Sequence, residues 1–333
     1  MARASWPARW RILGERARSA LLQRGLLPAR SAVPRERALV LLYNTMFGAA
    51  TPPPAPELPD GFELATDLRR FGEARAVVFH VPSLGRIDRL RKPDGQLWVA
   101  WWMECEQHFP RLTDPEFMGR FDLTMSHRLD ADVPVPYAGG IDEGELRTPP
   151  RPKRELAALF MTGTRETSGR TAYAAELMRH LEVHSYGRVL RNRRLREDRG
   201  RETKLETVSR YRFTLAFENA IAEDYVTEKL YDPLIAGSVP VYLGAPNVER
   251  LAPSAESYID VRDHASPREL ADRLLALASD QAAYDRHLVW KGRPFAPGFK
   301  ALLEGQRTDP FVRLCAAVGE PLGRSAWRSS EVV

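Results

Sequence analysis

The chain has 333 residues, 44% of them apolar and 28% charged, which is typical of a globular protein with room for two domains. Its net charge of +5 is confined to the start, because residues 1–37 contain nine Arg and two Glu and the rest of the chain carries a net −2. A near-neutral body argues against a nucleic-acid-binding domain, two cysteines are too few for a disulfide framework, and no apolar run reaches the roughly 18 residues that span a membrane.

The basic segment 1–37 has the pattern of an amphipathic helix. Arginines surround an apolar face whose members recur every three or four positions: Trp6, Trp10, Leu13, Ala17 and Leu21. Such a helix can lie in an anionic membrane surface, with residues 1–30 as the contact. It can equally pack on the protein's own body or form a frayed tail, and the pattern alone leaves these three interpretations open.

Three apolar runs in the first half of the chain predict buried strands: 38–48, in which the strand runs into a loop, 74–80, and 96–107, which ends in acids. Residues 51–56 contain consecutive prolines, which predict a loop. Strands separated by helix-length spacers are typical of a parallel α/β layer. The proline-rich, charged segment 147–156 has the composition of a linker, so we expect an N-terminal domain over residues 38–150.

The second half of the chain repeats this alternation. We expect a strand and loop at 156–163, strands at 182–187, 211–219 and 238–244, and helices at 170–181, 226–237 and 266–280. Gly237 closes the second helix, and Ser266 with Glu269 forms a capping box at the start of the third. The charge-dense segment 188–204 predicts a loop. These elements predict a C-terminal domain and a tail, at residues 151–300 and 301–333.

A predicted βαβ unit over residues 211–244 places polar side chains where parallel sheets bind ligands. Glu218 and Asn219 follow the strand, and Tyr225, Glu228 and Lys229 stand at the start of the next helix. The free N–H groups of a helix start and the Lys229 ammonium favour a phosphate, and the Glu228 carboxylate can accept sugar hydroxyls. This combination suits a nucleotide sugar. On physical grounds alone, a solvated helix start and a turn-forming Asn explain the same residues.

Segment 211–246 closely resembles the donor-binding signature of the alpha-1,3-fucosyltransferases, in which a Phe-Glu-Asn strand end precedes a Tyr-(Val/Ile)-Thr-Glu-Lys helix start. Other stretches resemble the same family in the same order: "LVLLYNTMFG", "ARAVVFHVPSL", "WMECEQ", "HRLDADVPVPYAG", "RTAYAAELMRHLEVHSYGR" and "YDRHLVWK". The resemblance covers about residues 38–295. It implies a GT-B architecture, with two facing Rossmann-like α/β domains, parallel sheets and an active site in the cleft between them.

The resemblance assigns the family's donor pocket to five residues of this chain: Arg170, Asn219, Tyr225, Glu228 and Lys229. By that assignment Arg170 and Lys229 hold the diphosphate of GDP-fucose and Glu228 holds the fucose hydroxyls. Tyr225 and Asn219 line the pocket. Where relatives often have Ser-Asn, this chain has Thr162-Gly163, which removes one Asn side chain from the expected set of donor contacts.

The family's catalytic base falls on Glu106. In an inverting displacement this base takes the proton of the acceptor hydroxyl, while the two cations offset the charge that grows on the leaving GDP. With those cations a metal is not required, and GDP-fucose is a substrate rather than a cofactor. The motif here is Glu104-Cys105-Glu106-Gln107, so an additional acid, Glu104, competes for the role.

One further motif, Asp130-Ala131-Asp132, matches the Asp-x-Asp metal site of another glycosyltransferase architecture. Its flank "VPVPYAG" resembles the fucosyltransferase N-terminal domain, so we interpret these residues as a turn between strand ends. The seven histidines show no metal-ligand spacing with the cysteines. The sequence therefore predicts no metal site.

The family resemblance implies transfer of L-fucose from GDP-fucose to a glycan, at O3 of an N-acetylglucosamine. Two alternatives stay open: transfer to another sugar or position, and a non-catalytic module that binds nucleotide sugars or glycans. The set of Glu106, Arg170 and Lys229 favours the enzyme. Secretory-pathway relatives begin with a membrane anchor and this chain shows none. We therefore expect a bacterial-type cytoplasmic enzyme that touches the inner membrane to meet a lipid-linked acceptor.

Overall fold

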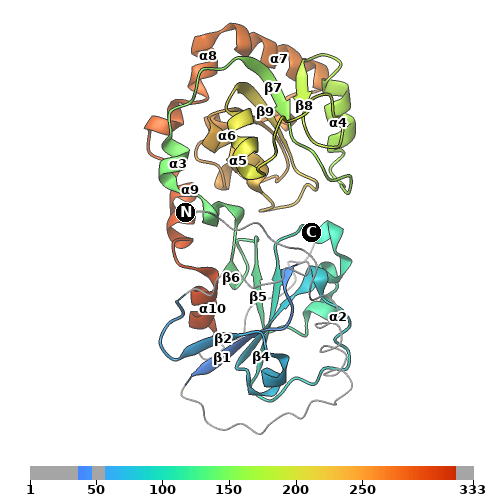
Figure 1. Ribbon diagram of the computed structural model, residues 1–333, viewed down its shortest axis with the longest axis vertical. Coiled ribbons are helices and arrows are strands. Elements are labelled where there is room, and N and C mark those ends of the chain that lie inside the picture. The colour runs from blue at the N-terminus through green and yellow to red at the C-terminus, as the bar shows by residue number, and fades with distance from the viewer. Residues whose placement is uncertain (1–36, 47–56, 320–333) are drawn as a thin grey trace, which may run out of the picture. The chain divides into compact units, whose positions relative to one another are not determined.

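The computed structural model describes residues 37–46 and 57–319, which form two α/β units (Figure 1). The first unit ends at Val135 and takes up the chain again from Thr308, and the second runs from Pro136 to Arg307. The predicted amphipathic helix and the proline loop 51–56 lie outside the described residues. Within the described ranges, no helix combines the length and the apolar character needed to cross a membrane.

The first unit is built on a six-stranded parallel sheet with the order β2-β1-β3-β4-β5-β6. Alternate residues of a strand enter different apolar clusters, since Val40 packs with Val78 while Leu41 packs with Phe79. Both faces of the sheet are therefore covered, which explains the nearly continuous apolar runs. The strands are Ala38–Leu42 (β1), Phe62–Ala65 (β2), Ala76–His80 (β3), Leu97–Trp102 (β4), Leu123–Ser126 (β5) and Val133–Pro134 (β6), and one short helix is Pro115–Met118 (α2).

The last described helix, Pro310–Gly319 (α10), belongs to the first unit. Its residues Phe311, Leu314 and Val318 form an apolar helix face that is buried in the same cluster as β1, β3 and β4. The structure thus differs from the expected division into 38–150, 151–300 and a separate tail. Residues from 308 return to the first unit because the first sheet covers the apolar face of α10, and the second unit already begins at residue 136.

The second unit contains a five-stranded parallel sheet with the order β11-β10-β9-β7-β8. Its strands are Glu155–Leu159 (β7), Val183–Ser185 (β8), Tyr211–Phe217 (β9), Val239–Leu243 (β10) and Ile259–Asp260 (β11). Its helices are Glu143–Arg147 (α3), Arg170–Leu177 (α4), Arg201–Val208 (α5), Glu228–Ala236 (α6), Pro267–Ser279 (α7), Gln281–Arg286 (α8) and Pro297–Gly305 (α9).

Helices cover both faces of the second sheet. Leu177 of α4 and Leu274 of α7 share one apolar cluster with Phe217, whereas Leu230 of α6 lies in another cluster with Ala216. The chain passes from β7 to β8 on one side and then returns to place β9 on the other side of β7. The strand order therefore reverses between β7 and β9. In open parallel sheets, the carboxyl ends of the strands at such a reversal form the usual ligand site.

Most expected elements are present with shifted ends. Gly237 has a left-handed backbone, with a φ of 72°, and closes α6, and Ser266 accepts from the backbone N–H of Glu269 at the start of α7. Pro233 lies within α6 without ending it. Two expectations are wrong. The strand predicted over 96–107 ends at Trp102, and the predicted loop 188–204 becomes helical at Arg201.

Candidate functional site

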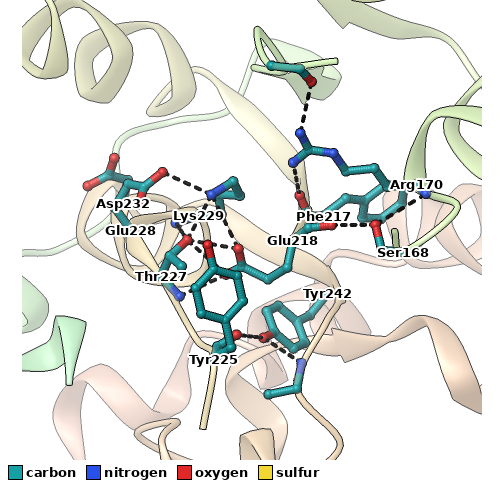
Figure 2. A network of polar contacts seen from close by, with 12 residues as sticks. Ser168, Arg170, Phe217, Glu218, Tyr225, Thr227, Glu228, Lys229, Asp232 and Tyr242 are labelled. Atoms are coloured by element: carbon teal, nitrogen blue, oxygen red, sulfur yellow. Dashed lines mark hydrogen bonds and ion pairs between the residues drawn. The ribbon is translucent and has the colours of Figure 1, made fainter. Parts of the chain in front are cut away.

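The carboxyl ends of β7 and β9 meet the starts of α4 and α6 at the strand-order reversal of the second sheet. β9 ends at Phe217 and is followed directly by Glu218 and Asn219, while α4 starts at Arg170 and α6 at Glu228. Figure 2 shows that polar contacts link these segments into one network. The sequence-predicted donor residues of the second unit therefore lie on neighbouring elements.

Glu218 is the buried centre of this network, with an exposed fraction of 0%. Its Oε1 accepts from the backbone N–H of Thr227 at 2.8 Å, and Thr227 Oγ1 lies 2.9 Å from both carboxylate oxygens. Thr227 is also the N-cap of α6. Burial raises the pKa of Glu218, and the nearby Lys229 ammonium acts in the opposite direction. Sequence reasoning placed Glu218 at the strand end but gave it no role.

Lys229 reaches back from the first turn of α6 into the same network (Figure 2). Its Nζ contacts Thr227 Oγ1 at 2.9 Å, Glu218 Oε2 at 3.2 Å and Glu228 Oε1 at 3.2 Å. Burial acts to lower the pKa of Lys229, but the Glu218 and Glu228 carboxylates outweigh it and hold this pKa above its ordinary value. The site therefore keeps a charged ammonium at the start of a helix, where the helix dipole also favours an anion.

Arg170 is the other cation of the site and is nearly buried, with an exposed fraction of 4%. Its Nη1 donates to the carbonyl of Phe217 and its Nη2 to the carbonyl of Gly163, both at 3.0 Å. These bonds join the start of α4 to the end of β9 and to the loop that follows β7. Its Nε is buried and has no hydrogen-bond partner in the described part of the chain. Burial lowers the pKa of Arg170, although the guanidinium remains charged at physiological pH.

A second set of bonds fastens the α4 start to β9. Ser168 Oγ donates to the carbonyl of Glu218 at 2.7 Å, and the backbone N–H of Thr167 donates to the carbonyl of Asn219 at 2.8 Å. Glu166 Oε2 accepts from the N–H of Gly169 at 2.7 Å. The backbone that carries Arg170 is therefore held in place before any ligand arrives, and sequence reasoning had assigned no role to this segment.

Asn219 and Tyr225 lie on the loop between β9 and α6. Asn219 Oδ1 is buried and lacks a hydrogen-bond partner within the described residues. Tyr225 is 2% exposed and packs edge-on against Tyr137, with ring centroids 6.4 Å apart. Asp224, with a φ of 62°, turns this loop and accepts from Asn247 Nδ2 at 2.8 Å.

An ion-pair cluster on α5 and α6 adjoins the site, and sequence reasoning missed it. Asp232 is 1% exposed and accepts from Arg201 Nε at 2.9 Å and from Lys204 Nζ at 2.8 Å. Burial acts to raise the pKa of Glu228, but the Lys229 and Lys204 ammonium groups and the hydrogen bond from Lys229 together hold this pKa below its ordinary value. Glu228 therefore remains a carboxylate at neutral pH.

Glu106, the candidate base, lies in the first unit. It begins a short 3-10 helix, Glu106–His108, after the carboxyl end of β4. Its Oε1 accepts from Trp102 Nε1 at 3.1 Å, and its Oε2 lies 3.9 Å from Nε2 of the fully buried His127. Glu104 lies on the bend after Trp102, so neither acid belongs to the strand that we predicted over 96–107.

The carboxylates of the Asp-x-Asp motif have local partners. Asp130 accepts from Arg128 Nε at 3.0 Å and from its Nη2 at 2.9 Å, and Asp132 Oδ2 accepts from the N–H and Oγ1 of Thr124, both at 2.8 Å. The motif forms the turn between β5 and β6, as we expected. Over residues 37–46 and 57–319, no group of three or more His, Cys, Asp or Glu side chains is placed to hold a metal ion.

Two family models match this chain. A family model described as "Fucosyltransferase, N-terminal" matches residues 35–138, and one described as "Glycosyltransferase family 10 (fucosyltransferase) C-term" matches residues 150–326. A "Putative fucosyltransferase-like protein" of Arabidopsis thaliana is 36% identical over 229 residues, which are 68% of this chain and 43% of that protein. The chain thus spans less than half the length of that plant relative.

A second relative and one solved structure match most of the chain. "Alpha-(1,3)-fucosyltransferase 7" of Bos taurus is 32% identical over 335 residues, covering 92% of this chain and 91% of that protein. A solved structure, "Crystal Structure of alpha1,3-Fucosyltransferase", matches with a TM-score of 0.52 and 15% identity, over 90% of this chain and 97% of that chain. This structural likeness shows the fold, which is of the GT-B type.

Proposed function

The chain belongs to glycosyltransferase family 10, the fucosyltransferases, and on that premise we propose that it transfers L-fucose from GDP-fucose to a hydroxyl of a glycan acceptor. The observation that carries this proposal is the placement of Arg170 and Lys229. Arg170 is bonded to the carbonyl of Phe217, and Lys229 is paired with the side chain of the next residue, Glu218. Two cations are thus attached to consecutive residues at the strand-order reversal.

This arrangement suits a diphosphate that leaves during the reaction. The two cations and the start of α6 offset the negative charge that grows on GDP as the bond to fucose breaks, and such charge stabilisation is the largest contribution in many enzymes. Glu228 has a side chain that is 49% exposed at the same helix start, where it can accept fucose hydroxyls. Asn219 Oδ1 offers a further acceptor to the donor substrate.

We assign the base to Glu106 and the reaction to the inverting class. The carboxylate removes the proton of the acceptor hydroxyl as that oxygen attacks the anomeric carbon on the face opposite GDP. The hydrogen bond from Trp102 fixes one carboxylate oxygen and so orients the group. A positioned general base contributes about 10²–10⁴-fold to the rate. The charges on the leaving group are met by Arg170 and Lys229, and the proposed mechanism uses no metal.

The acceptor that we propose is a glycan with an N-acetylglucosamine whose O3 receives the fucose, carried on a lipid at the inner membrane. The proposed place of action is therefore the cytoplasm, with residues 1–30 touching the membrane. The charge distribution supports this placement, since residues 1–37 hold nine Arg and two Glu while the rest of the chain is near neutral. An anionic surface attracts such a segment.

The test is to incubate the purified protein with GDP-fucose, with and without candidate acceptor disaccharides, and to measure the release of GDP. We expect release that depends on an acceptor containing N-acetylglucosamine, with a fucosylated product of the opposite anomeric configuration to the donor. Binding of GDP-fucose without release for any acceptor would identify a non-catalytic module instead. Release with a different acceptor would reassign the sugar or the position.

A further inference from the structure

The Lys229 ammonium has no N–H left for a phosphate. An ammonium carries three N–H donors, and three oxygens lie within hydrogen-bond range of this one: Thr227 Oγ1 at 2.9 Å, Glu218 Oε2 at 3.2 Å and Glu228 Oε1 at 3.2 Å. A diphosphate can therefore bind Lys229 only by replacing one of these partners or by sharing its donor.

The two carboxylates differ in how firmly they are held. Glu218 has an exposed fraction of 0%, and both of its carboxylate oxygens also accept from Thr227, which is itself buried at the N-cap of α6. Removing it from Lys229 would leave a charged carboxylate unpaired in the interior, which is strongly unfavourable. The Glu228 side chain is 49% exposed, so water can solvate it as soon as it leaves Lys229.

We propose that Glu218 is a positioning residue, the permanent counter-ion that aims Lys229, and that Glu228 is a displaceable counter-ion exchanged for the diphosphate of the donor. This inference rests on the proposed function, because it takes a nucleoside diphosphate sugar as the ligand. When a phosphate oxygen takes the place of Glu228 on Lys229, the freed carboxylate turns to the hydroxyls of the sugar. At the start of α6, binding of the diphosphate to Lys229 thus frees Glu228 to bind the sugar.

The exchange predicts effects of opposite sign for the two ligands. In the absence of the sugar, Glu228 competes with phosphate for Lys229, so it weakens the binding of GDP. With the sugar present, the same carboxylate gains hydroxyl partners and strengthens the binding of GDP-fucose. A residue that only stabilised the helix start would affect both ligands in the same direction.

The decisive variant is Glu228→Gln, which keeps the side-chain shape and removes the charge at a half-exposed position. Titration calorimetry should show GDP binding about twofold to fivefold tighter than in the wild type, in keeping with the strength of an exposed ion pair. GDP-fucose should bind more weakly, because a neutral amide accepts weaker hydrogen bonds than a carboxylate. Weaker or unchanged GDP binding in this variant overturns the exchange.

The positioning role is tested with Glu218→Gln. An amide in that place has one acceptor oxygen, so its NH2 group must face either Lys229 or the Thr227 donors, and the ammonium keeps at best a neutral acceptor. GDP should bind at least about tenfold more weakly, as expected for losing a hydrogen bond to a charged group, while guanosine, which has no phosphate, binds as in the wild type. Equal losses for GDP and guanosine, or no loss for GDP, would refute the positioning role.

Glu223→Gln is the matched control, since Glu223 is exposed on the same loop and undergoes the same change of charge. It should leave GDP and GDP-fucose binding unchanged. If the buried Glu218 variant does not fold, the Glu228 variant still decides the proposal, because it alone tests the exchange. A wild-type protein that binds neither GDP nor GDP-fucose refutes the proposed donor itself, and that outcome is distinct from normal binding with no change in the Glu228 variant.

Discussion

Arg170 donates from Nη1 to the carbonyl oxygen of Phe217 at 3.0 Å, which connects the first residue of α4 to the last residue of β9. The same guanidinium reaches the carbonyl of Gly163 after β7. Arg170 therefore connects the end of β9 to the loop after β7, where the order of the sheet reverses. It serves the fold and the proposed donor site at once, because both functions use a planar group with several fixed N–H donors.

This double role predicts that Arg170→Lys is not a conservative change. A lysine cannot reach both carbonyls with the fork geometry of a guanidinium. One buried carbonyl then loses its partner, which should lower the free energy of unfolding by about 1–3 kcal/mol. GDP affinity, measured by calorimetry, should fall at least about tenfold, as for the loss of a charge-assisted bond. Arg179→Lys, at a side chain that is 73% exposed, is the control, and an Arg170 variant that behaves like it would contradict this role.

Lys229→Met should make the stability of the protein depend on pH. The change leaves the buried Glu218 carboxylate without its cation, at a cost of about 3–5 kcal/mol near neutral pH. The pKa of Glu218 is already raised by burial, and it rises further when Lys229, which lowers it, is removed. The folded variant then binds that proton more tightly than the unfolded chain does. Its stability is therefore lost as pH rises through the folded pKa and is regained as pH falls.

Urea unfolding at about pH 8 and about pH 5.5 tests whether the stability of the variant falls as the pH rises. The free energy of unfolding of Lys229→Met should lie closer to that of the wild type at the lower pH than at the higher one. Lys300→Met is the control, because Lys300 has a side chain that is 66% exposed and lies 3.8 Å from Glu304. That variant should show a small deficit that does not change with pH. A deficit of Lys229→Met that grows on acidification would mean that Glu218 is not the group left unpaired.

Local sequence predicts those parts of the site that short-range chemistry determines. The Thr-Glu-Lys start of α6 and the glycine at its end follow from capping rules, and the structure has them at Thr227 and Gly237. The role of Glu218 could not be predicted in this way, because its partner Lys229 lies in another element and only the crossover brings them together. Arg201, at the start of α5, likewise pairs with Asp232, a residue 31 positions away, and local sequence does not indicate this partner.

The end of β4 shows why the strand prediction failed. The apolar run 97–102 continues into Met103 and Cys105, so alternation favours a longer strand. Cys105 is fully buried and precedes a 3-10 turn, which means that its burial comes from packing within a bend and not from a pleated strand. Hydrophobicity indicates that a residue is buried, but it does not distinguish these two ways of burying it.

Activity should survive removal of divalent cations. Arg170 and Lys229 supply the positive charge that the leaving GDP needs, and Asp130 is already paired with Arg128. Turnover in EDTA should therefore equal turnover in buffer, and Asp130→Asn should leave it nearly unchanged. GDP release measured in both conditions tests this expectation. Full loss in EDTA that Mn²⁺ restores, together with an inactive Asp130 variant, would instead identify the Asp-x-Asp motif as a metal ligand.

Deleting residues 1–30 should abolish membrane binding and leave turnover nearly unchanged. Seven of the nine arginines of segment 1–37 lie in this part of the sequence, and the proposed donor site lies wholly in the second unit. Turnover on an acceptor free in solution should therefore change little. Anionic vesicles should retain the full chain and not the truncated one, with less retention at high salt. Equal retention of both, or a truncated protein that fails to fold, would remove the support for membrane contact.

Glu106, and not Glu104, should be the base. The family resemblance assigned the base to Glu106, and the structure places the two acids in different local surroundings. Glu106 begins a 3-10 helix with one oxygen held by Trp102 Nε1 and the other 3.9 Å from buried His127, while Glu104 lies on the preceding bend. A base must be oriented before it can accept a proton efficiently, and these surroundings orient Glu106.

Glu106→Gln keeps the shape and the acceptor for Trp102 but removes the basicity. It should lower kcat by about 10²-fold or more, the usual contribution of a general base. GDP-fucose affinity should hardly change, because Arg170 and Lys229 belong to the other unit. Glu104→Gln, an identical change of charge two residues away, should retain most of the turnover. Steady-state kinetics measure kcat and calorimetry measures GDP-fucose affinity for both variants, and together they test which acid is the base. An inactive Glu104 variant beside an active Glu106 variant would move the base to the bend and leave the donor site as described.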